Sequence, residues 1–244
     1  MKIRISRLHL ELGGNIVLRD INLCMRNNGF NVLIGPNGSG KTSLLRVISG
    51  IYKPSSGEVF IEVKGDPRDE IFYLPSEPEA FPGLKVVDYL QIALGLRGLY
   101  GASDMSDVMG VLEDFEVSSL LDRDLYSLSS GERQRLYLAA AAASRRSVLL
   151  LDEPTSHLDI KWIYKSLNLL GRHAKDKLVV FTTHDINLAS LYASHVTVLS
   201  KGSVVADGDP GSVLREDLLS QVYGVRLVSG ELEGYKLFIP YKEG

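Results

Sequence analysis

The stretch of sequence that decides the fold reads Gly35-Pro36-Asn37-Gly38-Ser39-Gly40-Lys41-Thr42. The apolar run at residues 31–34 predicts a strand before it, and residues 43–49 have the pattern of a helix after it. A strand that ends in a glycine-rich turn and leads into a helix directs several backbone N–H groups, and the positive end of the helix dipole, to one point. Nucleotide phosphates fit there, so the stretch predicts binding of a nucleoside triphosphate.

The residues of this loop have predicted tasks. We expect Lys41 to reach the β- and γ-phosphates and the Thr42 hydroxyl to help hold Mg²⁺. The predicted contacts to the nucleotide come from Gly35, Pro36, Asn37, Gly38, Ser39, Gly40, Lys41, Thr42 and Ser43.

Composition excludes several classes of protein. The 244 residues are 45% hydrophobic and 23% charged, as in ordinary globular proteins. The net charge of −3 provides no overall basic field, so we expect no nucleic-acid partner. Cys24 is the single cysteine, which indicates a reducing compartment. We see neither a signal peptide at residues 1–7 nor a run of about 18 apolar residues, so any membrane role is expected to pass through a partner.

Strand and helix patterns are unevenly distributed along the chain. Strand patterns prevail up to residue 77, helical periodicity prevails from 78 to 146, and all-apolar strands then alternate with helices. Buried strands separated by helices indicate a parallel sheet covered on both faces. The predicted strands are residues 2–12, 16–25, 31–34, 58–61, 71–74, 148–151, 178–181 and 195–200, with a hairpin around Gly230. The predicted helices are residues 43–49, 86–96, 105–115, 131–144, 161–173, 186–192 and 212–222.

Two adjacent carboxylates, Asp152 and Glu153, follow the apolar strand at residues 148–151. They would lie at the carboxyl end of that strand, where open α/β sheets bind ligands. Because neighbouring residues at a strand end point in different directions, the two acids can divide the work. We expect Asp152 to hold Mg²⁺ and Glu153 to polarise the water that attacks the γ-phosphate. A solvated acidic pair is the alternative, and the phosphate loop disfavours it.

These segments together resemble the ABC ATPase family. The resemblance covers nearly the whole chain, and its most specific element is the signature segment at residues 128–132. The matching segments, in family order, are Gly35–Thr42, Leu128-Ser129-Ser130-Gly131-Glu132, Leu151-Asp152-Glu153-Pro154, Ser156-His157-Leu158-Asp159 and Thr183-His184-Asp185.

The resemblance implies a fold and a domain organisation. The fold is α/β: a P-loop NTPase core with a mixed or parallel sheet, an N-terminal antiparallel β-subdomain and an inserted α-helical subdomain. Residues 1–244 would form a single ABC ATPase domain. Its core would comprise residues 1–77 and 147–244, and its helical subdomain, with the signature, residues 78–146.

The resemblance also implies a composite ATP site. Two such domains would pack head to tail, so that Ser129 and the backbone around Gly131 meet the γ-phosphate held by the other copy. Since this chain has one phosphate loop and one signature, it would need a second copy of itself or a paralogous ATPase subunit. His184 resembles the switch histidine that contacts the γ-phosphate, and Asp159 the aspartate that links the two copies. Read as a sequence alone, Ser129 caps a helix that begins near Gly131.

Three features depart from the family pattern. Ser76 stands where a glutamine normally contacts Mg²⁺, so it would act through a water or be replaced by Glu77. The signature has Ser130 for glycine and Glu132 for glutamine. Leu12 replaces the aromatic residue that stacks on adenine, which leaves an apolar contact for the base. Lys41, Glu153 and His184 are retained, so hydrolysis is expected.

The tail points to one class of transport partner. Residues 208–225 and 183–189 resemble importers of iron–siderophore, haem and cobalamin, whose ATPase lies on the cytoplasmic face of the membrane with an integral permease and a substrate-binding protein. Residues 73–78 and 81–84 instead resemble ATPases of two-component exporters. A soluble assembly ATPase of iron–sulfur cluster type, and a subunit made inactive by Ser76, are further alternatives.

Overall fold

The computed structural model describes residues 1–95 and 105–241, and these divide into two compact units. The core unit comprises residues 1–73, 147–153 and 177 onward, and the helical unit comprises residues 74–146 and 154–176. The helix that follows the acidic pair therefore groups with the helical unit, whereas the sequence assigned residues 154–176 to the core.

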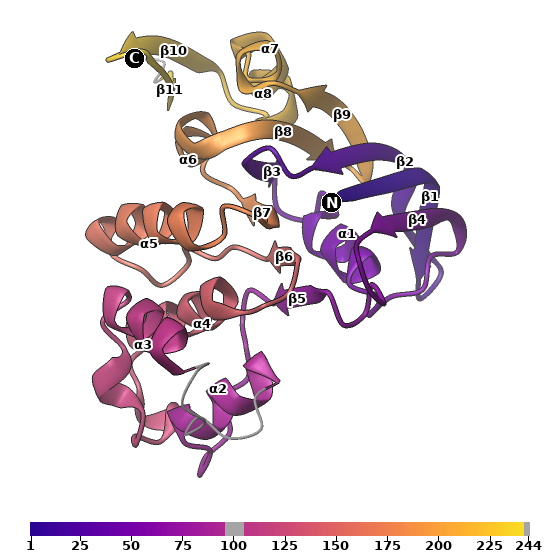
Figure 1. Cartoon of the computed structure of the whole chain (residues 1–244). Helices are drawn as coiled ribbons and strands as arrows, with labels where there is room; N and C mark the ends of the chain where they lie inside the picture. Colours follow the sequence, from indigo (N-terminus) through magenta and orange to yellow (C-terminus); the bar gives the residue numbers. More distant parts are fainter. Residues whose placement is uncertain (96–104, 242–244) are drawn as a thin grey trace. The chain divides into compact units, whose positions relative to one another are not determined.

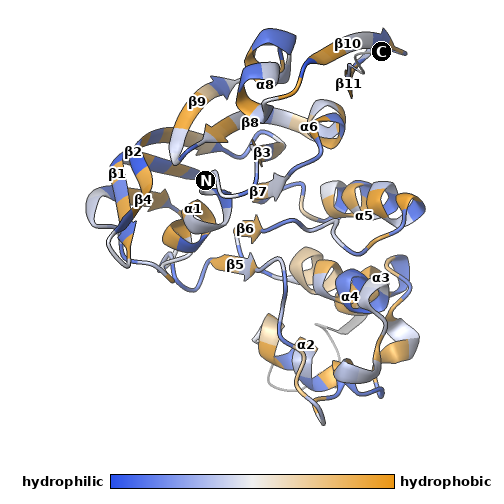
Figure 2. Cartoon of the chain, turned by 180° about the vertical axis from the view of Figure 1, so that it is seen from behind, coloured by the Kyte–Doolittle hydropathy of each residue, from blue (hydrophilic) through white to orange (hydrophobic). Residues whose placement is uncertain are grey.

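The core unit is built on a six-stranded sheet with the order β5-β6-β7-β3-β8-β9 (Figure 1). β6, β7, β3 and β8 pair in parallel, and β9 is antiparallel to β8, which makes the sheet mixed. Every residue of β3, β6 and β7 is buried, as expected of apolar strands in a sheet covered on both faces. Figure 2 shows β6 as hydrophobic along its length. The strands are β3 (Phe30–Ile34), β5 (Ile71–Leu74), β6 (Val148–Leu151), β7 (Leu178–Thr183), β8 (Ala193–Ser200) and β9 (Ser203–Gly208).

The predicted N-terminal antiparallel sheet is present, with the order β2-β1-β4. β1 and β2 form a hairpin whose last pair is Leu12 with Asn15. The turn residues Gly13 and Gly14 have φ values of 56° and 80°, which favour glycine in a two-residue hairpin turn. The strands are β1 (Lys2–Leu12), β2 (Asn15–Arg26) and β4 (Ser56–Glu62).

One hydrophobic core joins the two sheets through helix α1 (Lys41–Ile48). The helix buries Leu44, Leu45, Val47 and Ile48 against apolar side chains of β1, β2, β3, β6 and β7. Full burial of one such side chain stabilises the fold by about 1.5–3 kcal/mol. The phosphate loop, which directly precedes α1, is therefore fixed by a well-packed helix.

Helix α6 (Ile186–Tyr192) packs on the second face of the large sheet, against β3, β7 and β8. Side chains alternate along a strand, so Phe181 lies on the face opposite to its neighbour Val180, which belongs to the core around α1. Phe181 packs edge-on against Phe30, and Phe30 also contacts Tyr192 of α6. Since α6 begins two residues after His184, this packing fixes the segment that carries the histidine.

The helical unit contains the predicted helices and two short 3₁₀ turns. Its buried apolar residues include Leu112 and Phe115 at the end of α3 and Leu136 in α4. The predicted helix at residues 86–96 ends at Leu94, and Leu96 lies outside the described residues. The elements are α2 (Val86–Leu94), α3 (Met105–Asp114), η1 (Ser118–Leu120), η2 (Leu125–Ser127), α4 (Ser130–Ala143) and α5 (Ile160–His173).

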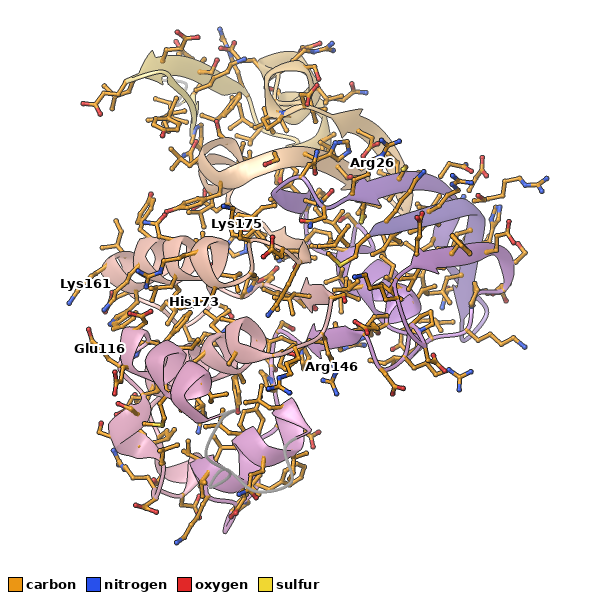
Figure 3. The ribbon with its side chains drawn as sticks, in the orientation of Figure 1. Arg26, Glu116, Arg146, Lys161, His173 and Lys175 are labelled. Carbon is orange, nitrogen blue, oxygen red and sulfur yellow. The ribbon has the colours of Figure 1, made fainter. Side chains whose placement is uncertain are left out.

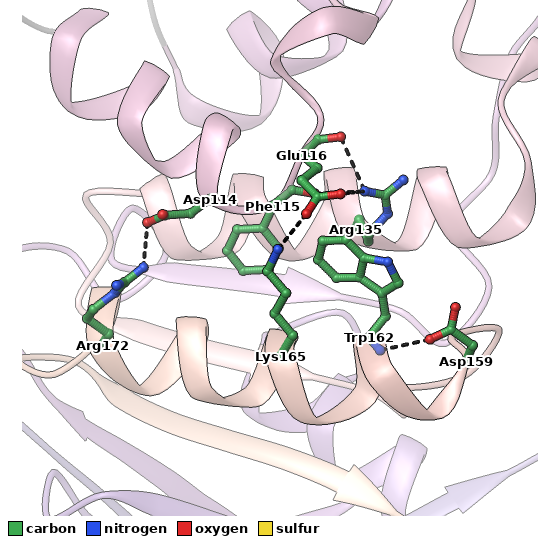
Figure 4. Close-up of polar contacts among 8 residues, drawn as sticks. All are labelled: Asp114, Phe115, Glu116, Arg135, Asp159, Trp162, Lys165 and Arg172. Carbon is green, nitrogen blue, oxygen red and sulfur yellow. Dashed lines mark hydrogen bonds and ion pairs between the residues drawn. The ribbon is translucent and has the colours of Figure 1, made fainter.

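Polar contacts join α3, α4 and α5 on the surface of the helical unit (Figure 4). The Lys165 ammonium lies 2.6 Å from the Glu116 carboxylate, and the Arg135 guanidinium donates to the Glu116 carbonyl oxygen at 3.2 Å. Both cations also lie 4.3 Å from the centroid of the Trp162 ring. Figure 3 labels Glu116 after α3, and Lys161 and His173 on α5.

The C-terminal part of the core unit differs from its prediction in detail. Two short helices replace the single predicted one: α7 (Pro210–Val213) and α8 (Glu216–Tyr223). The hairpin consists of β10 (Leu227–Leu232) and β11 (Tyr235–Pro240). Its turn is at Glu233 and Gly234, where φ is positive, and Gly230 lies within β10. β9 was missing from the predicted elements, because its short sequence resembles a turn-rich loop.

Candidate nucleotide site

The phosphate loop connects β3 to α1 by backbone conformations that favour glycine. Gly35, Gly38 and Gly40 have φ values of 149°, 76° and 104°. A Cβ atom on Gly35 would overlap the Leu199 carbonyl oxygen, whereas one on Gly38 would meet no atom within 4 Å. The loop is therefore held tightly at its start and is open around Gly38.

The N-terminus of α1 has backbone N–H groups that no side chain caps. Its first amides have no intrahelical acceptor, and its N-cap, Gly40, provides no side-chain cap. The buried Lys41 ammonium donates to the carbonyl oxygens of Gly35 at 2.7 Å and Pro36 at 3.2 Å. Burial lowers the pKa of Lys41, while the nearby charges of Glu153 and Asp152 raise it. Backbone donors, the helix dipole and an ammonium thus meet at one place, as an anion site requires.

The acidic pair lies at the end of β6, beside the end of β7. The buried side chain of Asp152 accepts a hydrogen bond from the Thr182 hydroxyl at 2.7 Å through Oδ1. Glu153 adopts the left-handed backbone region, with φ 47°, at a cost of about 1–3 kcal/mol for a residue other than glycine. Its backbone N–H donates to the Thr182 hydroxyl at 2.8 Å. The two acids therefore have different backbone conformations and different directions.

His184 lies in the turn between β7 and α6, which is fixed on both sides. The Thr183 hydroxyl accepts from the Asp185 amide, and the Asp185 carboxylate caps α6 by accepting from the amides of Asn187 and Leu188. His184 Nδ1 lies 3.4 Å from Glu153 Oε2, and its side chain is 66% exposed. The predicted base and the predicted switch histidine are thus adjacent.

A pocket of about 310 Å³ brings together most of the predicted nucleotide contacts of the core unit. Glu153 and Val17 line it together with the phosphate loop: Asn37, Gly38, Ser39, Gly40, Lys41, Thr42 and Ser43. Val17, from the start of β2, was missing from the predicted contacts, because an isolated valine in a strand carries no sequence signal for ligand binding. Leu12, the predicted apolar contact for the base, is 37% exposed at the end of β1.

The residues fit a magnesium nucleotide. Asp152 Oδ2 is buried and has no hydrogen-bond partner among the described residues, so it has a carboxylate oxygen to offer a cation or a bound water. The described part of the chain has no cluster of three or more acidic, histidine or cysteine side chains that could hold a metal ion. Magnesium is usually held by one or two protein oxygens together with phosphate oxygens and water, which suits Asp152 and Thr42.

This arrangement suits phosphoryl transfer to water. A bound Mg²⁺ would neutralise charge that develops on the transferring phosphate. Lys41 and the first amides of α1 can bind and orient the phosphates, and Glu153, at the pocket wall, can accept a proton from water. The exposed side chain of His184 follows the end of β7, beside Glu153, and can donate a hydrogen bond there.

Three predicted site residues belong to the helical unit. Ser76 is in the loop after β5, and Ser129 and Gly131 are at the start of α4. The predicted cap is confirmed: Ser129 accepts from the Glu132 amide, and the Glu132 carboxylate accepts from the backbone amide and the hydroxyl of Ser129. Asp159 also has a local structural task, since its side chain caps α5 by accepting from the Trp162 amide.

The chain matches the model of the ABC transporter family over residues 18–156, more than half of its length. It is 30% identical to the iron(3+)-hydroxamate import ATP-binding protein FhuC of Bacillus subtilis, over 90% of this chain and 87% of that protein. It is 33% identical to the hemin import ATP-binding protein HmuV of Shewanella denitrificans, over 91% and 92%.

Solved structures agree in fold. A chain of an inward-facing transporter described as of metal-chelate type superposes with a TM-score of 0.83, covering 99% of this chain and 98% of that chain at 23% identity. Sequence similarity over nine-tenths of the chain, together with the phosphate loop and Glu153 in one pocket, identifies the chain as a member of the ABC transporter family, one of its ATP-binding subunits, which are ATPases.

Proposed function

We propose that this chain hydrolyses ATP to power a membrane importer of iron complexes or cobalamin. The observation that carries this proposal is the similarity to iron-chelate and hemin import subunits along nearly the whole chain, including the tail beyond residue 156. Proteins that share only the phosphate loop and the acidic pair would not be expected to agree over nine-tenths of the chain.

The proposed catalytic site uses Mg²⁺ and a second ATPase subunit. Thr42, Asp152 and Ser76 would hold the ion, directly or through water. Glu153 would act as the base, and Lys41 and His184 would contact the phosphates. Ser129 and Gly131 would contact the nucleotide held by the other subunit, either an identical chain or a paralogue. The capped start of α4 supports this role, because it presents Ser129 on a stable helix end.

We propose that the chain reaches the membrane through a partner protein. No helix within residues 1–95 and 105–241 is both long and apolar enough to cross a bilayer. We propose that the chain binds an integral permease at the cytoplasmic face of the membrane, and that a substrate-binding protein delivers the cargo to that permease.

Affinity purification from detergent-solubilised membranes of the source organism tests the proposal. The tagged chain is expected to co-purify with a multispanning permease, and cells that lack the chain are expected to lose uptake of a ⁵⁵Fe-labelled chelate or of cobalamin. Recovery without any membrane protein would favour a soluble assembly ATPase. Loss of efflux with unchanged uptake would favour the exporter alternative, for which the Ser76-Glu77 sequence is the supporting feature.

A further inference from the structure

The Thr182 hydroxyl lies between the two catalytic acids and contacts both. Its oxygen is 2.7 Å from Asp152 Oδ1 and 2.8 Å from the backbone nitrogen of Glu153. The residue is fully buried at the end of β7, so water does not compete for these bonds. Its position follows from the sheet register: Leu151 pairs with Phe181, and the next residues of the two parallel strands therefore lie side by side.

The direction of both bonds is fixed by chemistry. The Glu153 N–H can only donate, so the hydroxyl oxygen accepts there, and the single hydroxyl proton goes to the Asp152 carboxylate. One consequence is that Asp152 Oδ1 is occupied, while Oδ2 keeps no partner among the described residues. The carboxylate is thus oriented with one particular oxygen available to a cation.

The second consequence concerns Glu153. Its left-handed backbone, with φ 47°, is an unusual conformation that needs support from the surroundings. The bond from its amide to Thr182 holds that conformation at the residue itself. The side chain then reaches the pocket wall beside the phosphate loop and lies 3.4 Å from His184.

We propose that Thr182 is a positioning residue for ATP hydrolysis, which selects the oxygen of Asp152 that serves Mg²⁺ and holds Glu153 in its working conformation. This inference rests on the roles proposed above for Asp152 and Glu153, and it is independent of the transported substance. Thr182 touches neither nucleotide nor metal in this role; it acts through the two acids.

The test compares purified variants in a steady-state ATPase assay with titrated Mg²⁺. Thr182→Val keeps the shape and removes the hydroxyl, so we expect kcat to fall about 10–100-fold and the half-saturating Mg²⁺ concentration to rise about tenfold. The KM for ATP at saturating Mg²⁺ should stay within about threefold, because the phosphate loop is untouched. Thr182→Ser keeps the hydroxyl and is expected to restore both parameters to near the wild-type values.

Thr197→Val is the matched control. Thr197 is a buried strand threonine whose hydroxyl also donates to a carboxylate, that of Asp207, at 2.6 Å. Its replacement should cost similar stability in a thermal melt without changing the Mg²⁺ dependence. Wild-type kcat and Mg²⁺ dependence in Thr182→Val, or equal changes in Thr197→Val, would overturn the proposal. Wild-type protein without any turnover would instead contradict the ATPase role itself.

A measurement on the wild-type protein covers the case in which Thr182→Val does not fold. The buried hydroxyl proton of Thr182 is expected to give a slowly exchanging NMR signal with cross-relaxation to the Glu153 amide proton. A Thr182 hydroxyl that exchanges as fast as those of exposed threonines would contradict the proposal.

Discussion

The N-termini of α1 and α4 both follow runs of glycine and serine, but the backbone N–H groups of their first turns are capped differently. α1 begins after Gly40, has no side-chain cap and has no acidic residue in its first turn. α4 begins after Ser129, which forms a capping box with Glu132. Hydrogen bonds from the Ser129 amide and hydroxyl lower the pKa of Glu132. An open helix end beside a lysine is an anion site, whereas a capped end is a stable platform that presents its serine.

Removing the charge at the open end should have the largest effect. Lys41→Met keeps the length of the side chain but loses the ammonium beside Gly35 and Pro36, so ATP turnover is expected to fall about 10²–10³-fold. Exposed Lys53→Met is the control and should hydrolyse ATP like the wild type. A steady-state phosphate-release assay measures both, and equal rates for the two variants would show that α1 is not the phosphate site.

The glycines that shape the open end should differ in cost. Gly35→Ala places a Cβ against the Leu199 carbonyl, so the free energy of unfolding should fall by about 3 kcal/mol or more. Gly38→Ala meets no neighbour and is expected to cost about 1–2 kcal/mol, from its backbone conformation alone. Urea unfolding of the two variants makes the comparison. Similar losses would mean that the loop relaxes freely around Gly35.

Damage to the capped end should be milder in stability and specific in assembly. Ser129→Ala removes the cap and is expected to lower the free energy of unfolding by about 1 kcal/mol. Binding of ATP by a single subunit should persist, because the phosphate loop is intact, while ATP-dependent association should weaken. Exposed Ser130→Ala, one residue further on, is the control for both the melt and the association assay. Association unchanged in Ser129→Ala would remove the serine from the proposed composite site.

The smallest effect concerns a surface cluster that joins α3 to α5. A hydrogen bond to His173, followed by the charge of Arg172, lowers the pKa of Asp114 below 3.8. The stability that the ionised Asp114 carboxylate contributes to the fold should therefore be present above about pH 4 and disappear as pH falls through the lowered pKa. Since Asp114 is partly exposed, Asp114→Asn should cost at most about 1 kcal/mol at pH 7. In thermal melts from pH 7 to pH 2, the difference between Asp114→Asn and the wild type should vanish at low pH. The control Glu113→Gln should melt like the wild type throughout.

Local sequence patterns predicted most of the fold and the part of the candidate site that lies in the core unit. The loop around Lys41 and the pair Asp152-Glu153 depend on a strand followed by a short polar segment, a pattern contained within a few residues. The capping box at Ser129 is equally local, with its partner three residues away.

The features that the sequence did not predict depend on distant pairs. Thr182 meets Asp152 only because β6 and β7 pair in one particular register, 30 residues apart. The threonine that precedes Thr183-His184 was a signal in retrospect, since a polar residue in a fully buried strand needs a partner. The turn of the C-terminal hairpin was placed at Gly230 for a related reason. Gly230 and Gly234 both suit a turn, and strand pairing selects Gly234.

The most direct measurement is light scattering of Glu153→Gln with ATP and Mg²⁺. The open end of α1 should bind ATP normally in this variant, while loss of the base slows hydrolysis by about 10²–10⁴-fold. The ATP-bound state should therefore accumulate, and two subunits should associate through the capped end of α4. A dimer that appears with ATP and Mg²⁺ and disappears with ADP is the predicted result; a monomer under both conditions would contradict the composite site.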